Sequence, residues 1–346
     1  MPREKASRDK VTSLDVAAAA GVSQSAVSRV FTPGASVSPK MAERVKKAAR
    51  ELGYRPNVLA RSLITGRSRI IGLVVAYLHN QFYPEALERL SNALQAEGYH
   101  VLVFVAMGRG PEVDRVIGEL LDYQVDGIIA ASVGLSDELF TRCEEAGIPV
   151  VLFNRGHADG RLSEVTSDNV AGGHRVADFL LAGGHTRIAH VSGWQGSTTG
   201  RDREAGFRKG LTAQGAEPVA VEDGMYRREV AAEVATALWQ TAQPDAIFVG
   251  NDHMAFGVMD ALRFRCGLSV PGDVSVVGYD DVQAAAWEAY DLTTVRQPAS
   301  RMVEATIQTL LALIEAPDRA AQKIAIDGPL IVRGSARVPE GWDAGI

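Results

Sequence analysis

The chain has 346 residues, of which 46% are hydrophobic and 23% are charged. These values are ordinary for a globular protein, and the length favours two or three domains. No run of about 18 apolar residues occurs, so we expect no membrane span. The N-terminal MPREKASRDKV lacks the apolar segment of a secretory signal, and Cys143 and Cys266 form neither a disulfide framework nor a zinc motif. We therefore expect a cytoplasmic protein.

The net charge of −6 is unevenly distributed along the chain. Residues 1–70 carry a net charge of +9, whereas the remaining residues carry −15. A basic head on an acidic body is typical of a nucleic-acid-binding module joined to another domain. A basic tail that only aids solubility fits less well, because the basic residues fall within helical patterns.

Residues 11–31 read VTSLDVAAAAGVSQSAVSRVF and predict a helix-turn-helix. The first helix would span Ser13–Ala20, and Gly21 can adopt the left-handed backbone that ends it. Ser23 is a good N-cap for a second helix from Gln24 to about Phe31. The alternative is an ordinary helical hairpin in some other small domain.

The second predicted helix would turn Val27 and Val30 toward the first helix. Its outward residues are polar and can reach base edges or phosphates. These candidate DNA contacts are Gln24, Ser25, Ser28 and Arg29.

A third helix should follow Ser38 and Pro39, with Gly53 at its end. Its expected buried stripe consists of Val45, Ala48, Ala49 and Leu52. This completes a three-helix headpiece over residues 1–56. The segment Asn57–Thr65 is too short to be a stable helix alone, so it would need a partner helix or DNA. The alternative is an ordinary interdomain linker.

From Arg69 onward, apolar runs alternate with helical patterns. Expected strands cover 70–76, 101–106, 127–131, 149–154, 188–193, 246–251, 274–280, 323–326 and 330–333. Expected helices cover 83–97, 111–122, 136–146, 169–182, 199–214, 227–240, 252–265 and 299–315. Continuous apolar strands joined through helices predict parallel sheets covered on both faces. So many units suit an α/β core of two doubly wound subdomains better than one large sheet.

Ligands of such sheets bind beyond the carboxyl ends of the strands. Polar and aromatic side chains follow several expected strands: residues 79–83, Asn154, Arg155, Trp194, Arg201, Arg203, Asn251, Asp252, Asp280 and Asp281, with Tyr226 and Trp287 in connecting segments. Amides, guanidiniums, carboxylates and flat rings suit a small polyhydroxylated ligand. Arg155 and Arg203 would also suit a carboxylate or phosphate. For Asn251 and Asp252, capping of the next helix and ligand binding are equally consistent with the sequence. Asp281 is expected to cap a helix, and Asp280 is expected to bind the ligand.

Enzyme motifs are absent. The chain has no GxGxxG at its first strand–helix turn, no phosphate-binding GxxxxGK[ST] and no GxSxG. Adjacent Asp280 and Asp281 would point apart on an extended segment. The seven histidines show no metal-ligand spacing. We therefore expect no enzyme activity, no cofactor and no metal.

The order and spacing of many stretches make the chain similar to the LacI/GalR family of bacterial transcriptional repressors from about Val11 to Arg337. These stretches include DVAAAAGVSQSAVSRVF, ELGYRPNVLARSL, VTSDNVAGG, GGHTRIAHVSG, RDREAGF, AIFVGNDHMAFGVMDAL, SVPGDVSVVGYDD and LIVRGSAR. The resemblance implies that Gln24, Ser25 and Arg29 read the major groove. It implies a hinge helix and linker over 57–68, with Asn57 and Leu63 at the DNA and Leu63 wedged into the central base step.

The resemblance also implies a periplasmic-binding-protein-like core over 69–346 with crossovers near 168, 297 and 325. The N-subdomain would cover about 69–168 plus 298–325, and the C-subdomain about 169–297 plus 326–346. An effector would bind between them. The implied contacts are Phe82, Asn154, Arg155, Arg203, Tyr226, Asn251 and Asp280, followed by Trp194, Trp287 and Gln297.

Two departures from the family are visible. Tyr290-Asp291 stands where proline often precedes the LTT stretch, which leaves the cleft near Trp287 open to question. The C-terminal RVPEGWDAGI lacks leucine heptads, so we expect a homodimer. The predicted function is a repressor at the nucleoid that binds double-stranded, pseudo-palindromic operator DNA under control of a sugar, sugar acid or sugar phosphate. The alternatives are a solute-binding protein for a transporter and a sugar-modifying or nucleotide-dependent enzyme.

Overall fold

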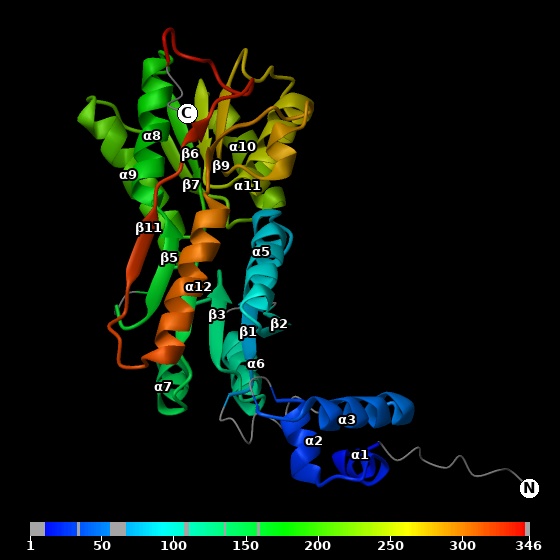
Figure 1. Ribbon diagram of the computed structural model, residues 1–346. Coiled ribbons are helices and arrows are strands. Elements are labelled where there is room, and N and C mark those ends of the chain that lie inside the picture. Colours follow the sequence, from blue (N-terminus) through cyan, green and yellow to red (C-terminus); the bar gives the residue numbers. More distant parts are fainter. Residues whose placement is uncertain are drawn as a thin grey trace, which may run out of the picture. The chain divides into compact units, whose positions relative to one another are not determined.

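The computed structural model describes residues 11–32, 35–55, 67–106, 111–134, 136–157 and 160–342. The chain forms two compact units, Met1–Ser68 and Arg69–Ile346 (Figure 1). None of the helices in the described ranges is long and apolar enough to cross a membrane.

The first unit contains three described helices: α1 (Ser13–Ala20), α2 (Gln24–Val30) and α3 (Pro39–Leu52). Side chains cap each of them, because Thr12, Ser23 and Ser38 each accept a backbone N–H of the first turn. Gly21 ends α1 at a φ of +62°, the left-handed turn that the sequence predicts. The helix-turn-helix is therefore confirmed.

The core of this unit is small and formed by all three helices. Val16, Val27 and Val45 are each no more than 1% exposed and belong to one cluster. The expected stripe on α3 is wrong at its last residue, since Leu52 is 39% exposed. Arg44 of α3 donates hydrogen bonds to the carbonyls of Ala20 and Gly21, which fastens α3 to the turn between α1 and α2.

The second unit contains two lobes, each built on a six-stranded sheet (Figure 1). The N-lobe sheet has the order β11-β5-β4-β3-β1-β2, and all of its neighbouring strands run parallel. Its strands are β1 (Ile70–Val75), β2 (His100–Val105), β3 (Gly127–Ala131), β4 (Val150–Phe153), β5 (Ser163–Ser167) and β11 (Lys323–Ile326). Its helices are α5 (Phe82–Ala96), α6 (Pro111–Asp122), α7 (Asp137–Glu145) and α12 (Ala299–Glu315).

The C-lobe sheet has the order β12-β10-β9-β8-β6-β7, and only β12 runs antiparallel to its neighbour among these described strands. Its strands are β6 (Ile188–Ser192), β7 (Ala220–Asp223), β8 (Ala246–Val249), β9 (Ser275–Asp280), β10 (Thr293–Arg296) and β12 (Leu330–Ile331). Its helices are α8 (Asn169–Ala182), α9 (Thr198–Ala213), α10 (Arg228–Thr241) and α11 (Asp252–Asp260).

The chain passes between the lobes three times. It leaves the N-lobe after β5, returns between β10 and α12, and leaves again between β11 and β12. These passages lie near 168, 297 and 327–329. The α/β class with two parallel-sheet subdomains is thereby confirmed.

Three strands of the structure were not predicted from the sequence: β5, β7 and β10. Strand β5 reads SEVTS and β7 reads AVED, so neither has the continuous apolar run of the buried central strands. Both instead take up places near a sheet edge. The expected helix 252–265 is also modified, because α11 continues into a π-helical turn at Ala261–Arg265.

Candidate functional site

The outward face of α2 carries the four predicted DNA contacts. Gln24, Ser25, Ser28 and Arg29 are all exposed, while Ala26 and Val27 face the core. Gln24 Nε2 donates to Ser13 Oγ at 2.9 Å, and the hydroxyls of Ser23 and Ser25 lie 2.9 Å apart. The helix therefore presents short polar groups and one long cation on a single side. The predicted contacts Asn57 and Leu63 lie outside the described residues, as does the rest of segment 57–65.

A cavity of about 440 Å³ lies between the lobes of the second unit. It forms where strands of both sheets end, because parallel strands present their carboxyl ends at one edge of a sheet. Seven predicted effector contacts line it: Asn154, Arg155, Trp194, Arg203, Tyr226, Asn251 and Asp280. The sequence-based placement of polar groups after β4, β6, β8 and β9 thus brings these side chains together.

The N-lobe wall of the cavity is organised by Asn154. Its backbone φ is +54°, a conformation that asparagine tolerates better than most residues. Its Nδ2 donates to the hydroxyl of Tyr83 at 3.1 Å, whereas its buried Oδ1 has no partner among the described atoms. Burial raises the pKa of Tyr83 to about 12, so this hydroxyl stays protonated. Beside it, the Arg155 guanidinium lies 5.4 Å from the ring centre of Trp194 in the C-lobe.

The C-lobe floor of the cavity is organised by Arg203, which is 3% exposed. Its Nε donates to Asn169 Oδ1 at 2.9 Å, one Nη donates to Gly250 O at 2.5 Å, and the other lies 3.6 Å from Asp280 Oδ1. The guanidinium stacks 3.7 Å from the ring centre of Tyr279. Burial lowers the pKa of Arg203, but Asp280 and the nearby Tyr226, Tyr279 and Tyr83 together outweigh it and raise that pKa above its ordinary value.

Asp280 supplies the buried carboxylate of the site. Its φ is +131°, which is strained for a residue with a side chain. Gln297 Nε2 donates to Oδ1 at 2.6 Å, and Asn80 Nδ2 donates to Oδ2 at 3.0 Å. Burial raises the pKa of Asp280 above its ordinary value, and Arg203 and these two hydrogen bonds offset only part of that rise.

The neighbouring positions have distinct roles. Asn251 both lines the cavity and caps α11, since its Oδ1 accepts the Met254 N–H at 2.9 Å. Asp281 was expected to cap a helix, and this is wrong. Its two oxygens instead accept hydrogen bonds from Arg296 and Arg333, each at 2.6 Å.

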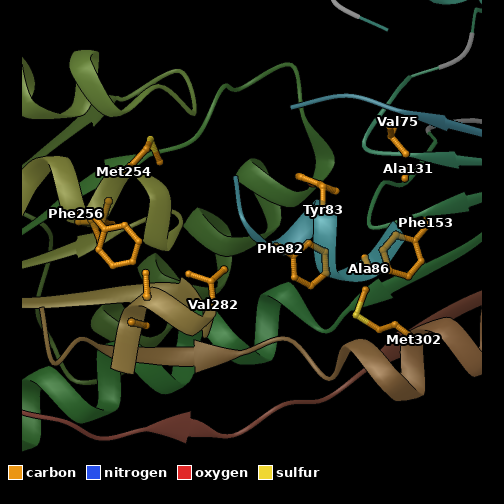
Figure 2. Packing of buried hydrophobic residues seen from close by; sticks show 14 of the residues in the cluster. Val75, Phe82, Tyr83, Ala86, Ala131, Phe153, Met254, Phe256, Val282 and Met302 are labelled. Carbon is orange, nitrogen blue, oxygen red and sulfur yellow. The ribbon is translucent and has the colours of Figure 1, made fainter. Parts of the chain in front are cut away.

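Three predicted contacts do not line the cavity. Phe82 is 4% exposed and packs in the hydrophobic core with Tyr83 and Phe153 (Figure 2). Trp287 is 51% exposed and lies outside the cavity lining. Gln297 is buried behind Asp280 and acts on the cavity through that carboxylate.

His79, Asn80 and Tyr83, which the strand-end rule offered as candidates without the family resemblance implying them, also line the cavity. The lining residues that neither argument predicted are Tyr77, Ser132, Thr199, Arg227, Arg228, Glu229 and His253. Ser132 directly follows β3, so the strand-end rule would have found it. Thr199 and Arg228 lie in the first turns of α9 and α10, where the sequence gives no signal that separates a lining residue from an ordinary helix start.

The cavity offers hydrogen-bond donors, hydrogen-bond acceptors and aromatic walls. Within the described ranges, no group of three or more histidine, cysteine or acidic side chains could hold a metal ion. An exposed polar recognition face on one unit and a ligand-sized cavity between two lobes of the other define a class of protein: DNA-binding regulators that respond to a small molecule.

Comparisons with known proteins agree with this class. Residues 12–57 match the family described as bacterial regulatory proteins, lacI family, and residues 177–336 match the periplasmic binding protein-like domain. The HTH-type transcriptional regulator CelR of Thermobifida fusca is 35% identical over 332 residues, which cover 92% of this chain and 96% of that protein. The chain belongs to the LacI family of bacterial transcriptional regulators.

Two solved structures extend the similarity to nearly the whole chain. The Lac repressor dimer bound to operator and the anti-inducer ONPF has a TM-score of 0.85 at 28% identity, covering 94% of this chain and 99% of that one. A CelR–cellobiose complex has a TM-score of 0.72 at 32% identity, covering 94% and 100%.

Proposed function

We propose that this regulator is a homodimeric repressor whose α2 helices read the two halves of a pseudo-palindromic operator. The effector binds in the cavity between the lobes and changes the affinity for DNA. The observation that carries this proposal is the cavity itself, in which buried polar groups from both lobes converge on one ligand-sized space. Of the similar solved structures, one holds an operator and another holds cellobiose.

The effector is a sugar or a closely related polyhydroxylated molecule. The buried Arg203 is already neutralised by Asp280, so the deep end of the cavity favours hydroxyl groups over a second carboxylate. Asn154 Oδ1 is a buried acceptor that a ligand hydroxyl would satisfy. The rings of Tyr226 and Trp194 offer flat apolar walls for the carbon face of a sugar.

The signal passes between the units by a change in lobe arrangement. A ligand that binds one arrangement more tightly shifts the population toward it, and the linked DNA affinity changes by the same free energy. Segment 57–65 is the proposed connection, with Asn57 and Leu63 at the operator centre.

The first test is a thermal-shift screen against sugars, sugar acids and sugar phosphates. A ligand that binds only the native state raises the melting temperature according to its concentration and Kd. The second test is a gel-shift experiment with intergenic fragments from the gene's own neighbourhood, with and without the ligand found. A screen without any stabilising sugar-like compound would contradict the effector class. Failure to retard every neighbouring fragment would contradict the assignment as a local repressor.

Other classes are less consistent with the site. A solute-binding protein has no use for a helix-turn-helix with a polar outward face, and the relatives are transcriptional regulators. We propose that the chain is not an enzyme, because the cavity-lining residues form no nucleophile–base pair or paired general acid and base. A protein that binds operator DNA acts in the bacterial cytoplasm.

A further inference from the structure

Asn80 occupies the loop between β1 and α5, at the N-lobe side of the cavity. It is 8% exposed. Its backbone N–H donates to Tyr77 O at 2.9 Å, and its Oδ1 accepts the Phe82 N–H at 3.1 Å. Because Oδ1 must face that N–H donor, the orientation of the amide is fixed and Nδ2 points the other way.

The Nδ2 group of Asn80 donates to Asp280 Oδ2 at 3.0 Å. Asn80 follows a strand of the N-lobe and Asp280 ends a strand of the C-lobe, so this hydrogen bond joins the two lobes at the cavity. Other hydrogen bonds also join the lobes: Gln81 Oε1 accepts the Ala284 N–H at 3.3 Å, the Gly156 N–H donates to Thr198 Oγ1 at 2.8 Å, and the hydroxyls of Ser167 and Tyr279 lie 2.9 Å apart.

The Asn80–Asp280 bond differs from these three because its acceptor is a buried carboxylate. Hydrogen bonds to ionised groups are about twice as strong as neutral ones, and a buried charge that loses a donor is penalised further. The carboxylate also contacts Gln297, just after β10, and Arg203 on α9. Separation of the lobes therefore removes the N-lobe donor while these two partners stay in place.

We propose that Asn80 is the positioning residue that ties the arrangement of the lobes to the Asp280 carboxylate. While Asn80 donates to Oδ2, the lobes keep the arrangement seen in this structure. When the bond is absent, the carboxylate takes its second donor from water or from a ligand hydroxyl, and the lobes adopt other spacings. Only the consequence of this device, a change in operator affinity, rests on the proposed function.

The test measures the distance between the lobes directly. Spin labels are placed at Glu145→Cys on α7 and Lys209→Cys on α9, both exposed, in a Cys266→Ser background, and labelled chain is diluted with unlabelled chain. Asn80→Ala should raise the ratio of minor to major lobe spacings at least about tenfold over the parent protein, as expected for loss of a charge-assisted hydrogen bond. Asn92→Ala, on the exposed side of helix α5, which follows the Asn80 loop, should leave the distance distribution unchanged.

A second variant separates this role from a local structural one. Asn80→Asp keeps an oxygen for the Phe82 N–H, so the start of α5 is preserved, but it places a second carboxylate against Asp280. If Asn80 only supports α5, Asn80→Ala alone will change the distances. If the proposal holds, both variants will shift them. Parental distances in Asn80→Asp at neutral pH would overturn the proposal, whatever the ligand screen and the gel shift show.

Discussion

At the scale of single residues, Arg203 shows how much of the cavity depends on one planar cation. Its guanidinium donates hydrogen bonds to Asn169 and Gly250, pairs with Asp280 and stacks on the ring of Tyr279. Lysine keeps the charge but lacks the fork and the flat face. Arg203→Lys should therefore lower the free energy of unfolding by about 1–3 kcal/mol. Urea unfolding followed by tryptophan fluorescence reports on the second unit, because all four tryptophans lie there.

A matched control for that substitution is Arg208→Lys on the same helix α9. Arg208 is more exposed and pairs with Glu204 at 2.8 Å, and such surface pairs contribute little to stability. Its variant should unfold at the urea concentration of the parent. Equal stability of both variants would mean that the guanidinium geometry at Arg203 is not needed.

His190 gives the second residue-scale prediction. Its Nδ1–H faces the carbonyl of Phe248 at 2.9 Å, and its ring stacks on Phe248 with centroids 4.6 Å apart. Burial lowers the pKa of His190 to about 4, so the folded state binds a proton less readily than the unfolded state. The stability that this provides is complete above about pH 6.5 and is lost as the pH falls toward 4.

The parent protein should accordingly lose up to about 1.4 kcal/mol of unfolding free energy per pH unit in this window on account of His190. His190→Phe keeps the stacking and removes the titration, so its stability should depend less on pH between 6.5 and 4. Urea titrations at four pH values compare the slopes. Identical slopes in parent and variant would show that His190 titrates normally.

The positions of residues that follow strands could be predicted from the sequence, but the directions of their side chains could not always be predicted. Asn154 and Asp280 were predicted because a buried apolar run ends just before or at each of them. Phe82 was misplaced because the direction of a helical side chain depends on where the helix begins. Helix α5 begins at Phe82, which sends Phe82 into the core and brings Tyr83 to the cavity. A shift of one residue, about 100° of helix, exchanges these roles.

At the scale of elements, helices were easier to predict than the three strands β5, β7 and β10, which carry no long apolar run. Helix caps such as Ser23 and Gly21 are local signals, and each was visible in the sequence. Strands β5 and β7 are stabilised by neighbours far away in the chain, so their own residues carry little information. The hydrogen bond from Arg44 to the end of α1 likewise joins residues distant in the sequence, so no local sequence pattern predicts it.

Helix α2 supplies the first element-scale prediction. The Arg29 side chain is exposed and makes no hydrogen bond or ion pair within the described residues. Arg29→Ala should weaken binding to the operator by about 1–3 kcal/mol if the side chain reads a base, with little effect on folding. Fluorescence anisotropy with operator and scrambled DNA measures both affinities. Equal losses on the two DNAs would reassign Arg29 to a phosphate contact.

The contact between α8 and α9 supplies the second prediction at the scale of elements. A Cβ at Gly206 would lie 2.0 Å from the backbone oxygen of Val170, so the two helices approach too closely for any side chain there. Gly206→Ala should destabilise the second unit by about 1–3 kcal/mol or more. Gly118→Ala in α6 is the opposite case, because its Cβ would meet only the tip of Arg142 at 3.5 Å. That variant should gain roughly 0.5–1 kcal/mol from helix propensity. Thermal unfolding of both variants should therefore give shifts of opposite sign.

At the scale of the whole molecule, the uneven distribution of charge controls the electrostatic attraction between the protein and DNA. The net charge of −6 would predict repulsion from a polyanion, but residues 1–70 carry +9. Charges separated by more than about 10 Å are largely screened at 0.1 M salt, so the first unit's own charge governs the approach. Each phosphate that it neutralises releases counterions, and affinity then falls with salt.

We therefore expect operator affinity to fall by roughly 10³–10⁵-fold between about 50 and 200 mM salt if 6–10 phosphates are contacted. Scrambled DNA should show a similar slope at weaker affinity, because phosphate contacts do not depend on sequence. Anisotropy titrations at five salt concentrations give both slopes. A flat dependence on operator DNA would mean that the basic head does not engage the phosphates. A slope on operator much shallower than on scrambled DNA would mean that base contacts replace phosphate contacts in the specific complex.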